Sequence, residues 1–194
     1  LEIFTYIQSI INNNQSFTSE NKIMPKFILK INSVDDTVYV DDDIVCFLAD
    51  SSLPEEWLCG FERRGRLFLL SGDKALSLCK TVGADGVVAE LKTDAPVKAQ
   101  VAKIRSQLGA GKVLGTVIIP RRHEAMLVSE TEPEFVAFKF PQESAAPAAE
   151  VVKWYNDLFL IQSAVDLTDG LQDIAAFDPD FVIINSRDYK DFGR

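Results

Sequence analysis

Short, almost wholly apolar runs alternate with segments of helical periodicity along most of the chain. The clearest unit joins the apolar run at 66–70 to a segment whose apolar residues repeat at i, i+3, i+4 and i+7. Those residues are Ala75, Leu78, Cys79 and Val82. Strands that are apolar nearly throughout, and that alternate with helices, are typical of parallel strands buried on both faces. The pattern therefore predicts an α/β protein with a parallel sheet.

Counting such runs from Lys26 gives eight predicted strands. They are 26–31, 44–49, 66–70, 86–91, 112–119, 135–140, 159–165 and 181–185. Successive strands start roughly 18 to 26 residues apart, closer than the ~31 residues per unit of a typical 250-residue barrel. The sequence thus predicts a small (β/α)8 TIM barrel. The alternative is an open doubly wound sheet, but such sheets usually stop at five or six strands and often carry a glycine fingerprint after the first.

The predicted domain organisation is one barrel over 26–194, preceded by a helical extension over 1–20. Apolar residues with helical spacing run through the extension, and a polar tract at 12–16 follows them. The apolar residues are Leu1, Phe4, Ile7, Ile10 and Ile11. No lysine or arginine precedes Lys22, so the segment lacks the pattern of a secretory signal. We expect it to cover an open end of the barrel or, alternatively, to form a homodimer contact.

Charge and cysteine content narrow the functional classes. The 194 residues include 29 acidic and 20 basic side chains, and the sequence pI is about 4.7. This balance argues against binding of nucleic acid or of an anionic membrane. The three cysteines form no Cys-x-x-Cys pair, and a single histidine makes a poor zinc set with them. We therefore predict a cytoplasmic protein with reduced thiols.

Several motifs carry a family resemblance. They are Phe68–Asp73, the Gly-Ala-Asp-Gly-Val stretch at 83–87, Val113–Gly115, the run at 135–140, and Arg122–Met126 after the fifth strand. Together they resemble the thiamine phosphate synthase/TenI family of small barrels, in particular a divergent bacterial branch. The resemblance covers roughly residues 26–186. Its most specific element is the Gly-Ala-Asp-Gly-Val stretch, for which we expect an architectural role.

The resemblance implies a magnesium site whose ligands are mostly missing. Catalytic members of the family join a pyrimidine pyrophosphate to a thiazole phosphate, with Mg²⁺ holding the pyrophosphate that leaves. Carboxylates at the C-terminal ends of the strands supply such a site. Of the family's acidic motifs only Asp73 and, with a one-residue shift, Asp94 have counterparts. Each also stands where a helix N-cap is expected, so a capping role is the alternative.

Candidate phosphate-binding and proton-transfer residues lie after the fifth, seventh and eighth predicted strands. Ser186 matches a phosphate-site serine of the family, and Ser163 stands where the family has a glycine pair. Arg121 and Arg122 lie at a predicted helix start on the face where anions bind, although they also suit a solvated helix start. His123, the only histidine, is the candidate for proton transfer.

The loss of these motifs predicts a degenerate paralogue. We expect it to bind a phosphorylated small molecule of the thiazole phosphate or thiamine phosphate type, without efficient Mg²⁺-dependent coupling. One alternative is an active thiamine phosphate synthase or thiazole tautomerase. Another is a non-catalytic interaction protein that uses the N-terminal helix.

Overall fold

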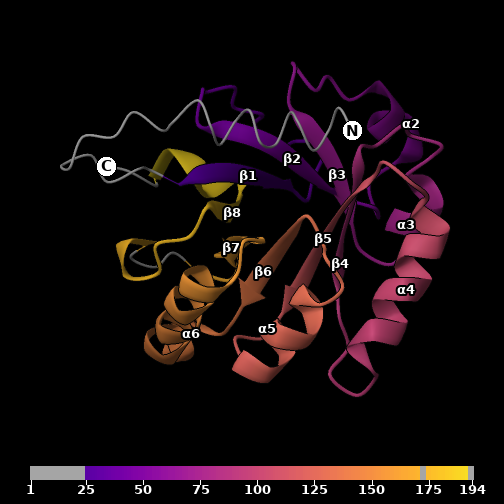
Figure 1. The fold of residues 1–194 in the computed structure, drawn as a ribbon. Helices are drawn as coiled ribbons and strands as arrows, with labels where there is room; N and C mark the ends of the chain where they lie inside the picture. The colour runs from indigo at the N-terminus through magenta and orange to yellow at the C-terminus, as the bar shows by residue number, and fades with distance from the viewer. Residues whose placement is uncertain (1–24, 171–173, 192–194) are drawn as a thin grey trace.

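The computed structural model describes residues 25–170 and 174–191, in which eight parallel strands close into a barrel (Figure 1). The strands are β1 (Lys26–Ile31), β2 (Ile44–Asp50), β3 (Leu67–Ser71), β4 (Gly86–Glu90), β5 (Val113–Ile118), β6 (Phe135–Lys139), β7 (Gln162–Asp166) and β8 (Phe181–Asn185). Each strand pairs with the next in sequence, and β8 pairs with β1. The predicted (β/α)8 barrel is therefore confirmed. The predicted extension over 1–20 lies outside the described residues.

The helical layer around this barrel is uneven. Its helices are α2 (Glu55–Gly60), α3 (Ala75–Leu78), α4 (Val97–Leu108), α5 (Arg122–Ser129) and α6 (Ala145–Leu158), with 3-10 helices η1 (Gln142–Ser144), η2 (Ile174–Ala176) and η3 (Ser186–Asp191). The longer helices α4, α5 and α6 lie outside β4 to β7 (Figure 1). The connection from β1 to β2 contains no helix. None of the helices in the described ranges is both long and apolar enough to span a lipid bilayer.

Two predicted helices are shorter than their sequence pattern suggests. The helix expected to continue to Val82 ends at Leu78, and turns lead from there to Gly83, whose φ is +64°. A (β/α)8 barrel predicts a helix after β7, but the described part of this connection contains only the 3-10 turn η2. Thr168, just after β7, bonds back to Asp166 through its N–H and its hydroxyl.

Alternating side chains of the strands form two apolar layers, one inside the barrel and one under the helices. The inner layer includes Ile28, Leu48, Leu69, Val88, Val117, Ala137, Ala164 and Ile183. Outward residues such as Phe47, Leu70 and Val165 pack in the larger outer cluster. Leu69, Val88, Val117, Ala137, Ile161 and Ile183 are among the residues that the predicted strands would bury, and of these Ile161 alone is misplaced. It precedes β7 and is partly exposed, because α6 runs to Leu158 and the chain turns before the strand begins.

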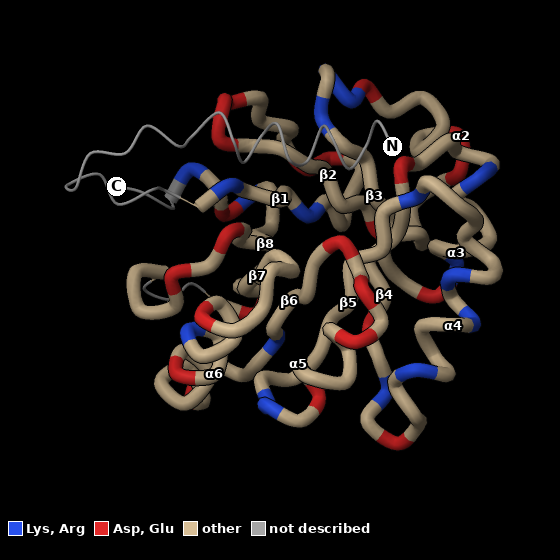
Figure 2. The backbone as a smooth tube through the Cα atoms, in the orientation of Figure 1, with Lys and Arg blue, Asp and Glu red and all other residues tan. Residues whose placement is uncertain are grey.

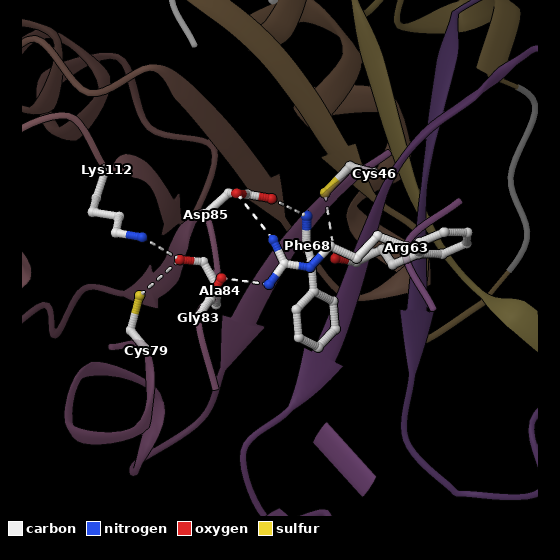
Figure 3. A network of polar contacts seen from close by, with 9 residues as sticks. Cys46, Arg63, Phe68, Cys79, Gly83, Ala84, Asp85 and Lys112 are labelled. Atoms are coloured by element: carbon white, nitrogen blue, oxygen red, sulfur yellow. Dashed lines mark hydrogen bonds and ion pairs between the residues drawn. The ribbon is translucent and has the colours of Figure 1, made fainter. Parts of the chain in front are cut away.

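The Gly-Ala-Asp-Gly-Val motif ties β3 to β4 at the amino-terminal face of the barrel (Figure 3). Asp85 accepts the backbone N–H of Phe68 at 2.8 Å and a guanidinium N–H of Arg63 at 3.2 Å. Arg63 also donates to the carbonyl of Gly83. These bonds lie at the end of the barrel associated with stability rather than catalysis. They agree with the architectural role expected for the motif.

The same arrangement recurs before β6 and β8. Glu134 directly precedes β6 and accepts the N–H of Leu114 at 2.6 Å. Asp180 directly precedes β8 and accepts the N–H of Ser163 at 2.9 Å. In each case an acidic side chain binds the second N–H of the preceding strand, as Asp85 does before β4. The amino-terminal face is thus held by a device that recurs every two strands.

Figure 2 shows residues of both charge signs interspersed along the described chain. The whole sequence carries a formal net charge of −9. A polyanionic partner needs a concentrated basic surface.

Candidate functional site

The principal candidate site is a cavity of about 360 Å³ at the carboxyl ends of the strands. We call it the mouth cavity. Its ionisable lining residues are Lys30, Asp50, Asp73, Glu90, Lys139 and Asp166. This end of a TIM barrel is where ligands bind, because the loops that follow the strands converge there.

Five of these six side chains are placed by the alternation of residues along their strands. Each stands two residues after an inner-layer residue and is the last or last but one residue of its strand. The pairs are Ile28 with Lys30, Leu48 with Asp50, Val88 with Glu90, Ala137 with Lys139, and Ala164 with Asp166. Successive side chains of a strand point to opposite faces, so these charged groups cap the inner apolar layer. The barrel core thus ends in a charged ring.

Lys139 is held as a cation by its carboxylate neighbours. Its Nζ lies 3.5 Å from Oδ2 of Asp169. Burial lowers the pKa of Lys139, but the nearby charges of Asp166, Asp169 and Glu90 outweigh it and leave the pKa above its ordinary value. The side chain is therefore an ammonium at neutral pH, suited to binding an anion rather than to acting as a nucleophilic amine.

Three charged side chains at the mouth cavity make no side-chain hydrogen bond or ion pair with the described residues. They are those of Lys30, Asp73 and Glu90, of which Glu90 lies near enough to Lys139 to raise its pKa. By contrast, Oδ1 of Asp166 accepts two bonds from Thr168, at 3.0 and 2.7 Å. One cation and two carboxylates thus remain available for a ligand.

Replacement of Lys139 by methionine should remove a pH-dependent part of the stability. A raised folded-state pKa stabilises the fold fully below the unfolded value, near 10.5, and this stabilisation is lost as the pH rises through the folded value. The difference in unfolding free energy between wild type and Lys139→Met should therefore shrink above about pH 10. Urea unfolding measured from pH 8 to 11.5 tests this. Lys103→Met, at an exposed lysine of α4, is the control. If the difference in unfolding free energy from wild type did not change with pH for either variant, the raised pKa of Lys139 would be contradicted.

A second cavity of about 360 Å³ lies between the loop after β4 and the start of α5. Asp94 and His123 both line it, together with Lys92 and Glu124. Asp73 lies instead in the mouth cavity, so the two predicted metal ligands are separated. Across the described ranges, no group of three or more His, Cys, Asp or Glu side chains could hold a metal ion. The residues present therefore do not fit the Mg²⁺ site that the resemblance implies.

Neither of these aspartates caps a helix, which was the alternative reading. The residue before α3 is Lys74 and the residue before α4 is Pro96, and neither helix start has a side-chain capping bond. The N–H of Lys74 is bound instead by the hydroxyl of Ser51 at 3.1 Å. Asp73 is thus left facing the mouth cavity.

The predicted phosphate-binding residues do not converge. Arg121 lies 3.6 Å from Glu124, and the guanidinium of Arg122 stacks over Trp154 of α6 at 5.1 Å from the ring centre. Ser186 is fully buried, and its hydroxyl donates to the carbonyl of Thr37.

Ser163 lies at the opposite end of the barrel from its predicted position. The sequence placed it after the seventh strand, but β7 begins only at Gln162, so Ser163 is the second residue of the strand. Its backbone and hydroxyl contact Asp180 at the amino-terminal face. The apolar residues 159–161, which suggested an earlier strand, form the turn after α6.

Sequence reasoning missed five of the six ionisable residues of the mouth cavity. Lys30, Asp50, Glu90, Lys139 and Asp166 each stand at or next to the last position of a strand and belong to no motif. The signal that could have found them is the alternation of side chains along a strand. A charged residue two positions after a buried inner-face residue, at the carboxyl end of a barrel strand, faces the mouth.

Comparison with known proteins supports the fold and goes no further. No protein-family model matches the chain, and no curated protein matches it. Among solved structures, the YdjI aldolase from Escherichia coli K12 is similar with a TM-score of 0.61 and 9% identity, over 94% of this chain and 79% of the aldolase chain. Tryptophan synthase from M. tuberculosis is similar with a TM-score of 0.54 and 13% identity, over 94% of this chain and 88% of the synthase chain.

A third similar structure is a cube-shaped, highly porous protein cage designed by fusing symmetric oligomeric domains. It has a TM-score of 0.55 and 10% identity, over 85% of this chain and 64% of the cage chain. The TM-scores above 0.5 indicate a shared TIM-barrel fold. The sequence identities are too low to carry function, which therefore has to be argued from the site.

Proposed function

We propose that the mouth cavity binds a phosphorylated small molecule of the thiazole phosphate or thiamine phosphate type. The observation that carries the proposal is that two ammonium groups, of Lys30 on β1 and Lys139 on β6, line one cavity. Its volume of about 360 Å³ lies within the usual range of small-molecule sites, about 300 to 1,000 Å³. The motif resemblance supplies the class of ligand.

Lysine is well suited to this role in a partly enclosed site. Ammonium–phosphate hydrogen bonds are charge-assisted and about twice as strong as neutral ones. The side chain of Lys30 makes no ion pair in the described part of the chain, so binding an anion there breaks none of the ion pairs among the described residues. Lys139 is held protonated by its carboxylate neighbours. Both residues can therefore contact a phosphate at neutral pH.

We further propose that the protein binds this ligand without efficient coupling activity. Departure of pyrophosphate in the family reaction needs Mg²⁺ in near-octahedral oxygen geometry. Asp73 and Asp94 line different cavities and cannot share one ion. This separation favours a degenerate paralogue over an active synthase.

Titration calorimetry with thiamine phosphate, comparing wild type and Lys30→Met, tests the proposal. We expect measurable binding by wild type and an affinity at least about tenfold weaker in Lys30→Met, a loss of about 1.4 kcal/mol or more. Lys103→Met, on the exposed face of α4, should bind as wild type does. Equal affinities for wild type, Lys30→Met and Lys139→Met, or no binding at millimolar ligand, would show that the mouth cavity is not the phosphate site.

A further inference from the structure

The mouth cavity extends beyond the interior of the barrel. Part of its lining, such as Val88 and Val117, belongs to the inner apolar layer. Another part packs with the outer cluster, under the helices, and consists of Ala75, Leu76, Val87, Ala89 and Ile104. We call the part of the cavity that these five residues line the apolar branch. Because one cavity touches both layers, it must pass through the wall of the barrel.

The passage lies between the carboxyl ends of β3 and β4. The pairing of β3 with β4 ends at Ser71 and Val88, whereas β4 stays paired with β5 over Ala89 and Glu90 as well. The chain that leaves β3 is held toward β2, because the N–H of Ser51 donates to the carbonyl of Ser71 at 2.8 Å. The last residues of β4 therefore border the cavity on the side of β3.

The shortness of α3 leaves room for the apolar branch. This helix has only four residues, whereas α4 has 12, and turns follow it. Leu76 of α3, Ala89 of β4 and Ile104 of α4 are therefore only partly buried, although all three are apolar. Apolar surface of this kind is favourably covered by an apolar group, and small-molecule sites combine such walls with a few charged groups that fix orientation.

Given the phosphate site proposed above, on which this inference rests, we propose that the mouth cavity selects phosphate esters with an apolar organic group. The phosphate lies at Lys30 and Lys139 inside the barrel, and the apolar group leaves between β3 and β4 to fill the apolar branch. The lysines and the branch line one continuous cavity, so a single small ligand can contact both. The lysines thus fix the phosphate, and the branch sets the specificity for the rest of the ligand.

The test compares methyl phosphate with butyl phosphate, which carry the same charge and differ by three carbons. A methylene removed from water strengthens binding by about fourfold, so wild type should bind butyl phosphate at least about tenfold more tightly in ligand-detected NMR titrations. Ala89→Leu fills the branch and should abolish most of this preference. Leu76→Gln makes the wall of the branch polar at a partly exposed position, where folding should tolerate it, and should also reduce the preference.

Leu127→Gln is the matched control. Leu127 is a partly buried leucine of α5 that lines the second cavity, so this variant should keep the wild-type preference. Lys30→Met should weaken both esters by the same factor, since it removes only the contact to phosphate.

The outcomes separate this inference from the proposal on which it rests. Equal affinity of wild type for the two esters, or an undiminished preference in both Ala89→Leu and Leu76→Gln, overturns the apolar branch as a binding site but leaves phosphate binding intact. Loss of the preference in Leu127→Gln instead would place the apolar group in the second cavity and overturn it as well. Failure of both esters and of thiamine phosphate to bind overturns the proposed function too.

Discussion

Gly86→Ala should destabilise the barrel by about 3 kcal/mol or more and lower the melting temperature by roughly 6 to 12 °C. A Cβ at Gly86 would lie 2.0 Å from the carbonyl oxygen of Val113 and 2.8 Å from its Cα. Both atoms belong to the backbone of the paired strand β5, so no side-chain rotation relieves the overlap. β4 and β5 must therefore move apart at this pair of residues, which weakens the hydrogen bonds between them and the packing of the barrel core. Thermal unfolding followed by circular dichroism measures the effect.

Gly60→Ala is the matched control for this substitution. Gly60 is the last residue of α2, and a Cβ there meets nothing within 4 Å. Alanine reduces the freedom of the unfolded chain without strain, so stability should be unchanged or higher by up to about 1 kcal/mol. If Gly86→Ala melted within about 2 °C of wild type, the close approach of β4 to β5 would be wrong.

Asp85→Ala should cost about 2 to 3 kcal/mol, the second largest effect that we expect. The variant loses the carboxylate that binds Arg63 and also leaves the N–H of Phe68, a fully buried residue, without its acceptor. An unsatisfied buried donor carries its full desolvation penalty. Urea unfolding at neutral pH measures the difference in unfolding free energy between wild type and variant, when both curves are fitted with the same dependence of that free energy on urea concentration.

Asp85→Asn and Glu62→Ala make this prediction specific. The asparagine carbonyl can still accept from Phe68 but loses the charge opposite Arg63, so it should fall between wild type and Asp85→Ala. Glu62 carries a largely exposed side chain paired loosely with Arg64 at 3.8 Å, and its loss should cost well under 1 kcal/mol. If Asp85→Ala and Glu62→Ala lowered the unfolding free energy by the same amount, Asp85 would have no special role in barrel stability.

The fold was predictable because the barrel is encoded redundantly along the chain. Strands such as Val113–Ile118 and Phe181–Asn185 are fully buried, and their nearly continuous apolar runs are visible without alignment. Helix extents were less predictable, because local bonds decide them. Thr168 bonds to Asp166 rather than starting a helix, and turns follow α3 before Gly83. The spacing of apolar residues alone predicts neither of these local bonding arrangements.

The candidate site was only partly predictable, because motif matching and barrel geometry point to different residues. Motif positions led to Ser163 and Ser186, yet one lies at the amino-terminal face and the other is bonded to Thr37. Lys30 and Lys139 match no motif, and their position in the mouth cavity follows only from the register that turns them inward. Of the metal-binding, phosphate-binding and catalytic residues predicted from the sequence, Asp73 alone lines the mouth cavity.

A crystal structure of the chain with thiamine phosphate, at about 100 times its measured dissociation constant, tests the central claim most directly. The account predicts the phosphate within about 4 Å of the ammonium of Lys30 or Lys139, consistent with a charge-assisted contact. A phosphate bound instead beside Arg122 and His123 in the second cavity, with the mouth cavity lacking ligand, would contradict it.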